Sequence, residues 1–225
     1  DEPGRALRPR IDIGPGQRAR KRRVGIEAEI LGKLSADKEL ELSISGSGPH
    51  KLYYTRKLRY FVQFFDFVPR ITNERGVVVP PTELKEFGFT SALNRDVAIS
   101  VLNSSLFFWF FSVFSDVRNV NKREIFAFRC SIGRMEVELV SLLTSLCKKL
   151  MDDFHANSRT LTSDYGKHGV LNIQSFQPRL SKPIIDEIDE VLARHYSLSN
   201  DELDFIKSFD IKYRLGRDIE SDEDE

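Results

Sequence analysis

Apolar residues recur at helical spacing in two long segments of the chain. In the first, they lie three or four positions apart and predict an amphipathic helix that ends near Asn157; these positions are Leu139, Leu142, Leu143, Leu146, Leu150 and Phe154. The second segment begins at Pro183, a residue suited to the first turn of a helix. Its apolar face comprises Ile184, Ile188, Val191 and Leu192. Ser199 and Glu202 then have the spacing of a capping box, which predicts a further short helix.

A different pattern, dense in Tyr, Phe and Val, runs from His50 to Pro69. This stretch has few good helix formers and is bounded by prolines, so it predicts two strands with a turn at its basic centre. The sequence RGVVVPP predicts a third short strand that ends at Pro80. Upstream, Ile26, Ile30 and Leu34 predict a short helix within residues 24–42.

Residues 97–115 contain no charged side chain, and this length raises the question of a membrane span. Asn103, Ser104, Ser105 and Ser112 dilute the apolar character, and no belt of Trp and Tyr flanks the run. We therefore expect one central buried helix here and no membrane partner. Together these elements predict an α+β fold, with a small antiparallel sheet packed on several helices and a C-terminal helical hairpin.

Composition divides the chain into regions of different charge. Residues 1–23 carry eight Arg or Lys against three acids and show no apolar period, so we expect a flexible basic arm or linker. Residues 24–180 are expected to form the main domain, 181–217 the helical hairpin and 218–225 an acidic tail. Because the chain begins at Asp1 without Met, we expect it to be a piece of a longer protein.

The sequence contains none of the motifs that a methyltransferase active site requires. The only double proline, Pro80–Pro81, lacks the Asn/Asp and aromatic neighbours of an amino-methyltransferase loop, and no Gly-rich nucleotide turn is present. Asp66, Glu83 and Lys85 have the order of a nuclease metal site, although Glu-x-Lys is common by chance. We expect no catalytic residues, metal ligands or cofactor in this fragment.

The two cysteines, Cys130 and Cys147, are far apart and lack the spacing of a zinc site. We expect both to be reduced packing residues of a cytoplasmic protein.

The remaining signal is for binding, because two interior stretches, 51–75 and 118–134, are basic. Arg can pair with guanine, Asn with adenine, and Lys suits phosphate. The first group of candidate DNA-binding residues is Arg118, Asn119, Asn121, Lys122 and Arg123; the second is Tyr54, Arg56 and Arg59. The alternatives stay open: the segment after the apolar run could be a capped turn between two elements, and the tyrosines ordinary sheet residues.

The segment LNSSLFFWFFSVFSDVRNVNKREI resembles the TaqI-like C-terminal specificity region of adenine-specific DNA methyltransferases. HKLYYTRKLRYF upstream and the C-terminal residues from Ser181 to Asp218 are similar to neighbouring parts of such restriction-modification enzymes. The resemblance spans roughly residues 50–217 and implies that double-stranded DNA is the partner.

The same resemblance implies a parent enzyme with a preceding catalytic domain, which binds S-adenosylmethionine, methylates adenine and in some members is fused to a nuclease. This chain would grip the duplex and read its sequence while packing against that catalytic domain, and would not methylate alone. The alternative is a protein–protein scaffold module of a multisubunit enzyme that makes no DNA contact, for which an exposed apolar patch would be the marker.

Overall fold

The uncharged run at residues 97–115 forms the buried centre of the protein, but as two helices. In the computed structural model, which describes residues 15–40, 44, 47–56, 61–115, 117–166 and 169–215, α2 (Ala92–Asn103) and α3 (Ser105–Phe114) meet at an angle of 64°. The prediction of burial is confirmed for residues 97–111, whereas Val113 and Phe114 at the end of the run are 44% and 49% exposed. The prediction of one continuous helix is wrong. No single helix in these ranges is long and apolar enough to cross a membrane. The bent pair of α2 and α3 reaches that length and apolarity only when the two helices are taken together.

The polar residues at the bend are responsible for this break. Ser104 caps α3, since its hydroxyl accepts the Phe107 N–H (3.0 Å) and donates to the Val101 carbonyl (2.6 Å). The Asn103 amide accepts the backbone N–H of Phe64 (3.1 Å) and donates to the carbonyl of the same residue (2.9 Å). Asn103 thus bonds to the backbone of β2 as a neighbouring strand would.

A carboxylate from a distant helix completes the bend. Asp189 is 1% exposed, and its oxygens accept the first two N–H groups of α3, those of Ser105 (3.3 Å) and Leu106 (3.1 Å). A negative charge at a helix N-terminus is favoured by the helix dipole. Arg214, 3% exposed, donates to the Ser105 hydroxyl (3.0 Å) and lies over the rings of Phe61 and Phe108.

The first sheet is antiparallel and covers the buried helices. Its central strand β1 (His50–Thr55) pairs with β2 (Phe64–Phe65) and β4 (Leu84–Phe89), and α2 packs against the three strands. The two strands predicted between residues 50 and 69 are confirmed. The strand predicted in RGVVVPP is wrong: only an isolated bridge from Thr72 to Val78 forms there, and the polar segment at β4, which was not predicted, supplies the third strand.

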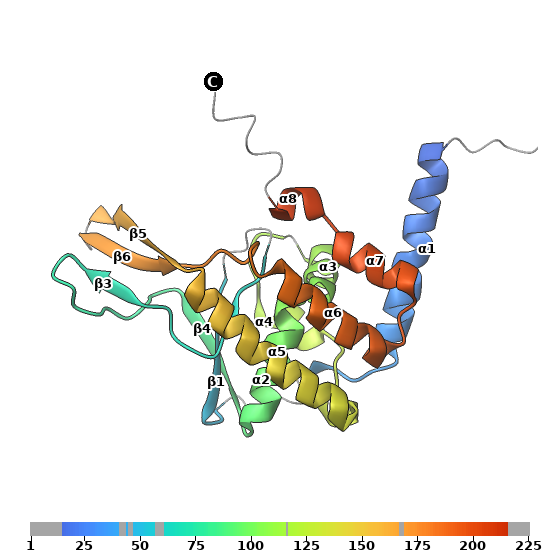
Figure 1. Cartoon of the computed structure of the whole chain (residues 1–225), viewed down its shortest axis with the longest axis horizontal. Coiled ribbons are helices and arrows are strands. Elements are labelled where there is room, and N and C mark those ends of the chain that lie inside the picture. Colours follow the sequence, from blue (N-terminus) through green and yellow to red (C-terminus); the bar gives the residue numbers. More distant parts are fainter. Residues whose placement is uncertain are drawn as a thin grey trace, which may run out of the picture.

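The second sheet is an arm that projects from the body (Figure 1, left). It consists of β3 (Ile71–Asn73), β6 (Val170–Ser175) and β5 (Arg159–Asp164), in that order and all antiparallel. A cluster of aromatic rings joins the arm to the body: Phe65, Phe67, Phe154 and Phe176.

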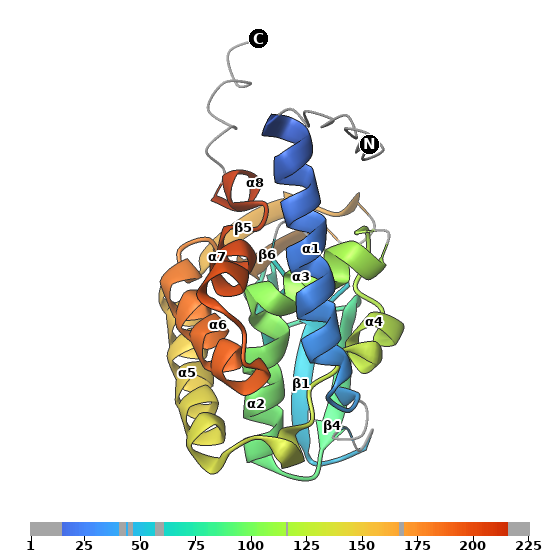
Figure 2. The ribbon, with the colours of Figure 1, turned by 90° about the vertical axis from the view of Figure 1, so that its right-hand side faces the viewer.

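Further helices surround α2 and α3 (Figures 1 and 2). They are α1 (Pro15–Ser35), α4 (Lys122–Ala127), the 3₁₀ helix η2 (Ile132–Arg134), α5 (Val137–Ala156), α6 (Lys182–Tyr196), α7 (Asn200–Ser208) and α8 (Ile211–Leu215). The α+β prediction is confirmed, as are the helices of residues 137–156 and 182–196. The capping box is also present, because the Ser199 N–H donates to Glu202 (2.5 Å) and the Ser199 hydroxyl accepts the Glu202 N–H (3.3 Å).

Two boundaries differ from those predicted. Helix α1 already begins at Pro15, so the basic positions from there to Arg23 are helical and do not form an irregular linker. At the other end, α6 is followed by the two short helices α7 and α8, and α7 packs against α1, α3 and α6, so one simple hairpin does not describe this region. Residues 1–14 and the predicted acidic tail lie outside the described residues.

The buried carboxyl of Asp189 predicts a pH-dependent stability. Burial raises its pKa from 3.8 to about 6, although Ser105, Leu106, Lys182 and Arg214 act in the opposite direction. The folded protein therefore retains a proton that the unfolded chain has released. The associated stability is complete below pH 3.8 and is lost as the pH rises through about 6.

We predict that the free energy of unfolding of the wild-type protein falls by as much as about 3 kcal/mol relative to that of Asp189→Asn between pH 4 and 7, measured by urea unfolding. Glu190→Gln, an exposed neighbour on α6, is the control and should show no such trend. A free-energy difference between wild type and Asp189→Asn that is constant over this range would contradict the assignment.

Candidate nucleic-acid interface

The predicted DNA-binding segment forms a capped turn that leads into α4. The backbone N–H of Asn121 donates to the Glu124 carboxylate (3.1 Å), which completes a capping box, and the Asn121 amide donates to the Asn119 carbonyl (3.1 Å). The same amide accepts a hydrogen bond from Arg56 Nη2 (3.0 Å), and the Val120 N–H donates to the Arg56 carbonyl (2.9 Å). These contacts fix the end of β1 against the start of α4.

Four cationic residues lie around this turn, and all are exposed: Arg56, Arg118, Lys122 and Arg123. Lys122 Nζ is 5.5 Å from the centroid of the Phe87 ring, and Arg123 Nη2 pairs with Glu124 Oε1 at 2.9 Å. The Arg123 side chain stays 80% exposed, whereas Glu124 is 3% exposed. Cations therefore face solvent while the neighbouring carboxylate is buried. We call these four residues the cationic edge.

The turn before the cationic edge contains a backbone that is unfavourable for its residue. Val117 has φ of 58°, in the left-handed region, and its N–H donates to the Ser115 hydroxyl (3.0 Å). A β-branched residue in this region is a genuine outlier, and such conformations persist only where the surrounding structure enforces them. The chain direction at the adjacent Arg118 is thus imposed by the fold.

Two of the predicted contact residues have other roles. Tyr54 is 2% exposed and stacks between Phe64 and Phe87 with centroid distances of 5.3 and 5.2 Å. The prediction that Tyr54 contacts DNA is therefore wrong, and the alternative of an ordinary sheet residue is right. Both ends of the Asn121 amide already bond within the protein, so it positions Arg56 and is not free to read adenine in this conformation.

The other predicted residues divide differently. Arg56, Arg118, Lys122 and Arg123 gather at one edge, which joins members of the two candidate groups. Asn119 is half-buried beside them and supplies its carbonyl to Asn121. Arg59 lies outside the described residues.

The nuclease alternative fails on geometry. Asp66 directly follows β2 and Glu83 directly precedes β4, with β1 between them and at opposite ends of the pairing. Strand rise and spacing place the two acids on the order of 15 Å apart, whereas ligands of one divalent ion each lie within about 2.6 Å of it. Asp66 instead lies 3.7 Å from Arg95 Nη2. Among the residues that the structure describes, no three His, Cys, Asp or Glu side chains converge as a metal site.

The cysteines are unsuited to nucleophilic chemistry. Both are buried free thiols, and burial raises the pKa of Cys130 to about 12 and that of Cys147 even further. A thiolate is the reactive form, so these groups are inert near neutral pH.

Outside the cationic edge, Asp37 and His195 form an acid–histidine pair of the kind used in catalysis, with Asp37 Oδ2 3.0 Å from His195 Nε2. Burial raises the pKa of Asp37, but the Ser131 N–H and His195 lower it more, with a net decrease. Both side chains are nearly buried, and the Asp37 carboxylate accepts the Ser131 N–H (2.9 Å). The pair therefore ties the end of α1 to α6 and to the segment before η2.

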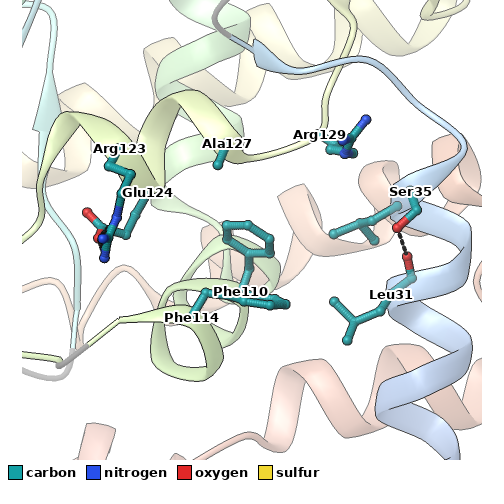
Figure 3. Close-up of a pocket in the computed structure, with 9 residues that line it drawn as sticks. Leu31, Ser35, Phe110, Phe114, Arg123, Glu124, Ala127 and Arg129 are labelled. Atoms are coloured by element: carbon teal, nitrogen blue, oxygen red, sulfur yellow. Dashed lines mark hydrogen bonds and ion pairs between the residues drawn. The ribbon is translucent and has the colours of Figure 1, made fainter.

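A pocket that the sequence did not predict opens beside the cationic edge, between α1, α3 and α4 (Figure 3). Its volume is about 370 Å³, and its apolar wall consists of Leu31, Leu34, Phe110, Phe114 and Ala127. Arg123 and Glu124 lie on one side, and Arg129 and Ser35 on the other. The sequence does not indicate this pocket directly, because Phe110 and Phe114 belong to the uncharged run of residues 97–115 that we predicted to be buried.

The cap at Asn121 predicts a measurable stability. We expect Asn121→Ala to destabilise the protein by about 1 kcal/mol, because both the helix cap and the bond to Arg56 are lost. A double-mutant cycle with Arg56→Ala should give a coupling of about 0.5 kcal/mol or more in urea unfolding. The matched control is Asn119→Ala, which keeps the carbonyl used by Asn121 and should change stability by less than about 0.5 kcal/mol. Equal effects at the two asparagines would contradict the capping role.

Known proteins add no assignment to this geometry. Comparisons with protein-family models, with curated proteins and with solved structures find no match. The resemblance of the sequence to a methyltransferase specificity region therefore stays a prediction, and the function has to be argued from the charge and geometry of the cationic edge.

Proposed function

We propose that this chain is a DNA-binding module, and that it is the target-recognition part of an adenine-specific DNA methyltransferase of the restriction-modification type. The observation that carries the DNA-binding proposal is the cationic edge: exposed Arg and Lys side chains on a braced turn, with the neighbouring acid buried. The finer assignment to a methyltransferase is supported by the sequence resemblance alone.

The cationic edge suits a polyanion for a physical reason. Phosphate contacts supply most of the affinity of DNA-binding proteins, and Arg and Lys are the usual donors. The Arg56 side chain is held by a hydrogen bond to Asn121, and Arg118 follows the strained backbone of Val117, so two of these cations are constrained before a ligand binds. Donors that are positioned before binding lose less entropy when they contact phosphate.

Within the parent enzyme, this module would grip duplex DNA while the target adenine enters the preceding catalytic domain. S-adenosylmethionine would bind in that domain, and the present chain would contribute no catalytic group or cofactor site. A cytoplasmic location follows from the same proposal.

A second candidate is docking of a protein partner without DNA contact. Val113, Phe114 and Val117 are 44%, 49% and 45% exposed at the end of α3, and an exposed apolar patch can mark an interaction surface. However, Arg118 directly follows Val117, and Arg123 lines the same pocket as Phe114. The neighbouring cations favour a polyanionic ligand over an apolar protein surface.

The proposal predicts salt-sensitive duplex binding. Fluorescence anisotropy with a labelled 20-base-pair duplex should give an affinity that falls steeply with salt, because counterions are released when phosphates are bound. Arg118→Ala with Arg123→Ala should weaken binding at least about tenfold and make the salt dependence shallower by about one ion per cation removed.

The matched control is Lys148→Ala with Lys149→Ala, two exposed lysines of α5 on the opposite side from α4 (Figure 2). It removes the same charge and should change affinity by less than about twofold if binding is local to the cationic edge. Absence of salt-sensitive binding by wild-type protein at tens of micromolar, or equal losses in the two double variants, would refute the proposal.

A further inference from the structure

We propose that the pocket between α1, α3 and α4 binds one unstacked nucleotide of a DNA strand, with the base on Phe110 and Phe114 and the phosphate at Arg123 or Arg129. This inference rests on the proposed DNA binding and goes beyond it, because it assigns the module a preference for single-stranded or locally opened DNA.

The apolar wall of the pocket has the chemistry that a base requires. Phe114 is 49% exposed, and its ring lies against that of the buried Phe110, with centroids 4.7 Å apart and planes inclined by 41°. Leu31 and Leu34 of α1 line the facing wall. Stacking on an exposed aromatic ring is the common way in which proteins hold unpaired bases, because every base has a π-face.

The size of the pocket also fits a small aromatic ligand. Its volume of about 370 Å³ lies within the roughly 300–1,000 Å³ that is usual for small-molecule sites. Residues of α1, α3 and α4 line it, and a base that inserts between these helices has to leave the stack of a duplex. The geometry therefore favours an unpaired nucleotide over an intact base pair.

The charges at the rim suit the phosphate of that nucleotide. The lining residues include two arginines against one acid, Glu124. Arg129 pairs with Glu39 at 3.1 Å, but both side chains are more than 40% exposed, and such surface pairs contribute little and can be exchanged for a phosphate. Glu124 adds no free negative charge at the rim, because its carboxylate is buried, accepts the Asn121 N–H and pairs with Arg123.

The test is an anisotropy titration with a labelled 15-nucleotide single strand and the matching duplex. Phe114→Ala should lower single-strand affinity about tenfold, since stacking of a base contributes about 1–3 kcal/mol, or roughly 5- to 150-fold. Duplex affinity should change by less than about twofold. Phe114→Tyr keeps an aromatic ring and should bind single strands within about threefold of wild type.

Two further variants separate the pocket from its surroundings. Val113→Ala alters an exposed neighbour on α3 that does not line the pocket, and should leave single-strand affinity unchanged. Ala127→Trp adds bulk at an exposed lining position without removing Phe114, and should block single-strand binding to a similar extent as Phe114→Ala. Adenosine monophosphate, added as a competitor, distinguishes a free nucleotide from a strand. If millimolar nucleotide competes with the single strand for wild type but not for Phe114→Ala, a free nucleotide is also a ligand of this pocket.

The outcomes distinguish this inference from the proposed function. If duplex binding persists and both Phe114→Ala and Ala127→Trp bind single strands like wild type, the nucleotide pocket alone is overturned. This result is expected if the occupant is an apolar side chain of a protein partner. Failure of wild-type protein to bind either form of DNA would overturn both.

Discussion

The carboxylate of Asp189 at the first turn of α3 is the contact on which the arrangement of this protein depends. It joins α6 to the bend between α2 and α3 and accepts the N–H groups of Ser105 and Leu106. Unpaired backbone donors in a buried place cost about 1–3 kcal/mol each, so the bend exists because the rest of the structure supplies acceptors for it. Ser104 accepts the Phe107 N–H and donates to the Val101 carbonyl at the same bend, and the Asn103 amide donates to the Ile99 carbonyl at the end of α2.

The bend determines where the candidate surface lies. A straight helix through residues 97–115 would continue in the direction of α2, whereas the 64° turn directs α3 to pack against α7 and α6 and places Phe114 at the surface beside α1 and α4. The turn that follows carries the cationic edge. The buried acid at one end of α3 and the exposed cations after its other end thus belong to one structural unit.

Much of the helical structure could be predicted because its signals are local. Helix α5 follows from one apolar stripe, α6 from a first-turn proline, and the cap of α7 from two residues three positions apart. The bend could not be predicted in the same way, since its decisive acceptor, Asp189, is more than 80 positions away from Ser105. Strand β4 was missed because its first half is charged and only its pairing with β1 makes it a strand.

The candidate surface shows the same limit. Charge and spacing were enough to group Arg118, Lys122 and Arg123. The hydrogen bond between Asn121 and Arg56 adds a residue that follows a distant strand. Local sequence could not show that Tyr54 is enclosed by two phenylalanines or that Asn121 is occupied by internal bonds. The pocket depends on three helices at once, so it becomes visible only in three dimensions.

Hydrogen exchange followed by mass spectrometry, with and without duplex DNA at low salt, tests most directly whether the α3–α4 unit is the nucleic-acid surface. We predict slower exchange on DNA binding in peptides from residues 105–129 and at the end of β1, with no change in α5 or α6. Protection confined to the arm of β3, β5 and β6, or to the α5–α6 face, would contradict this prediction.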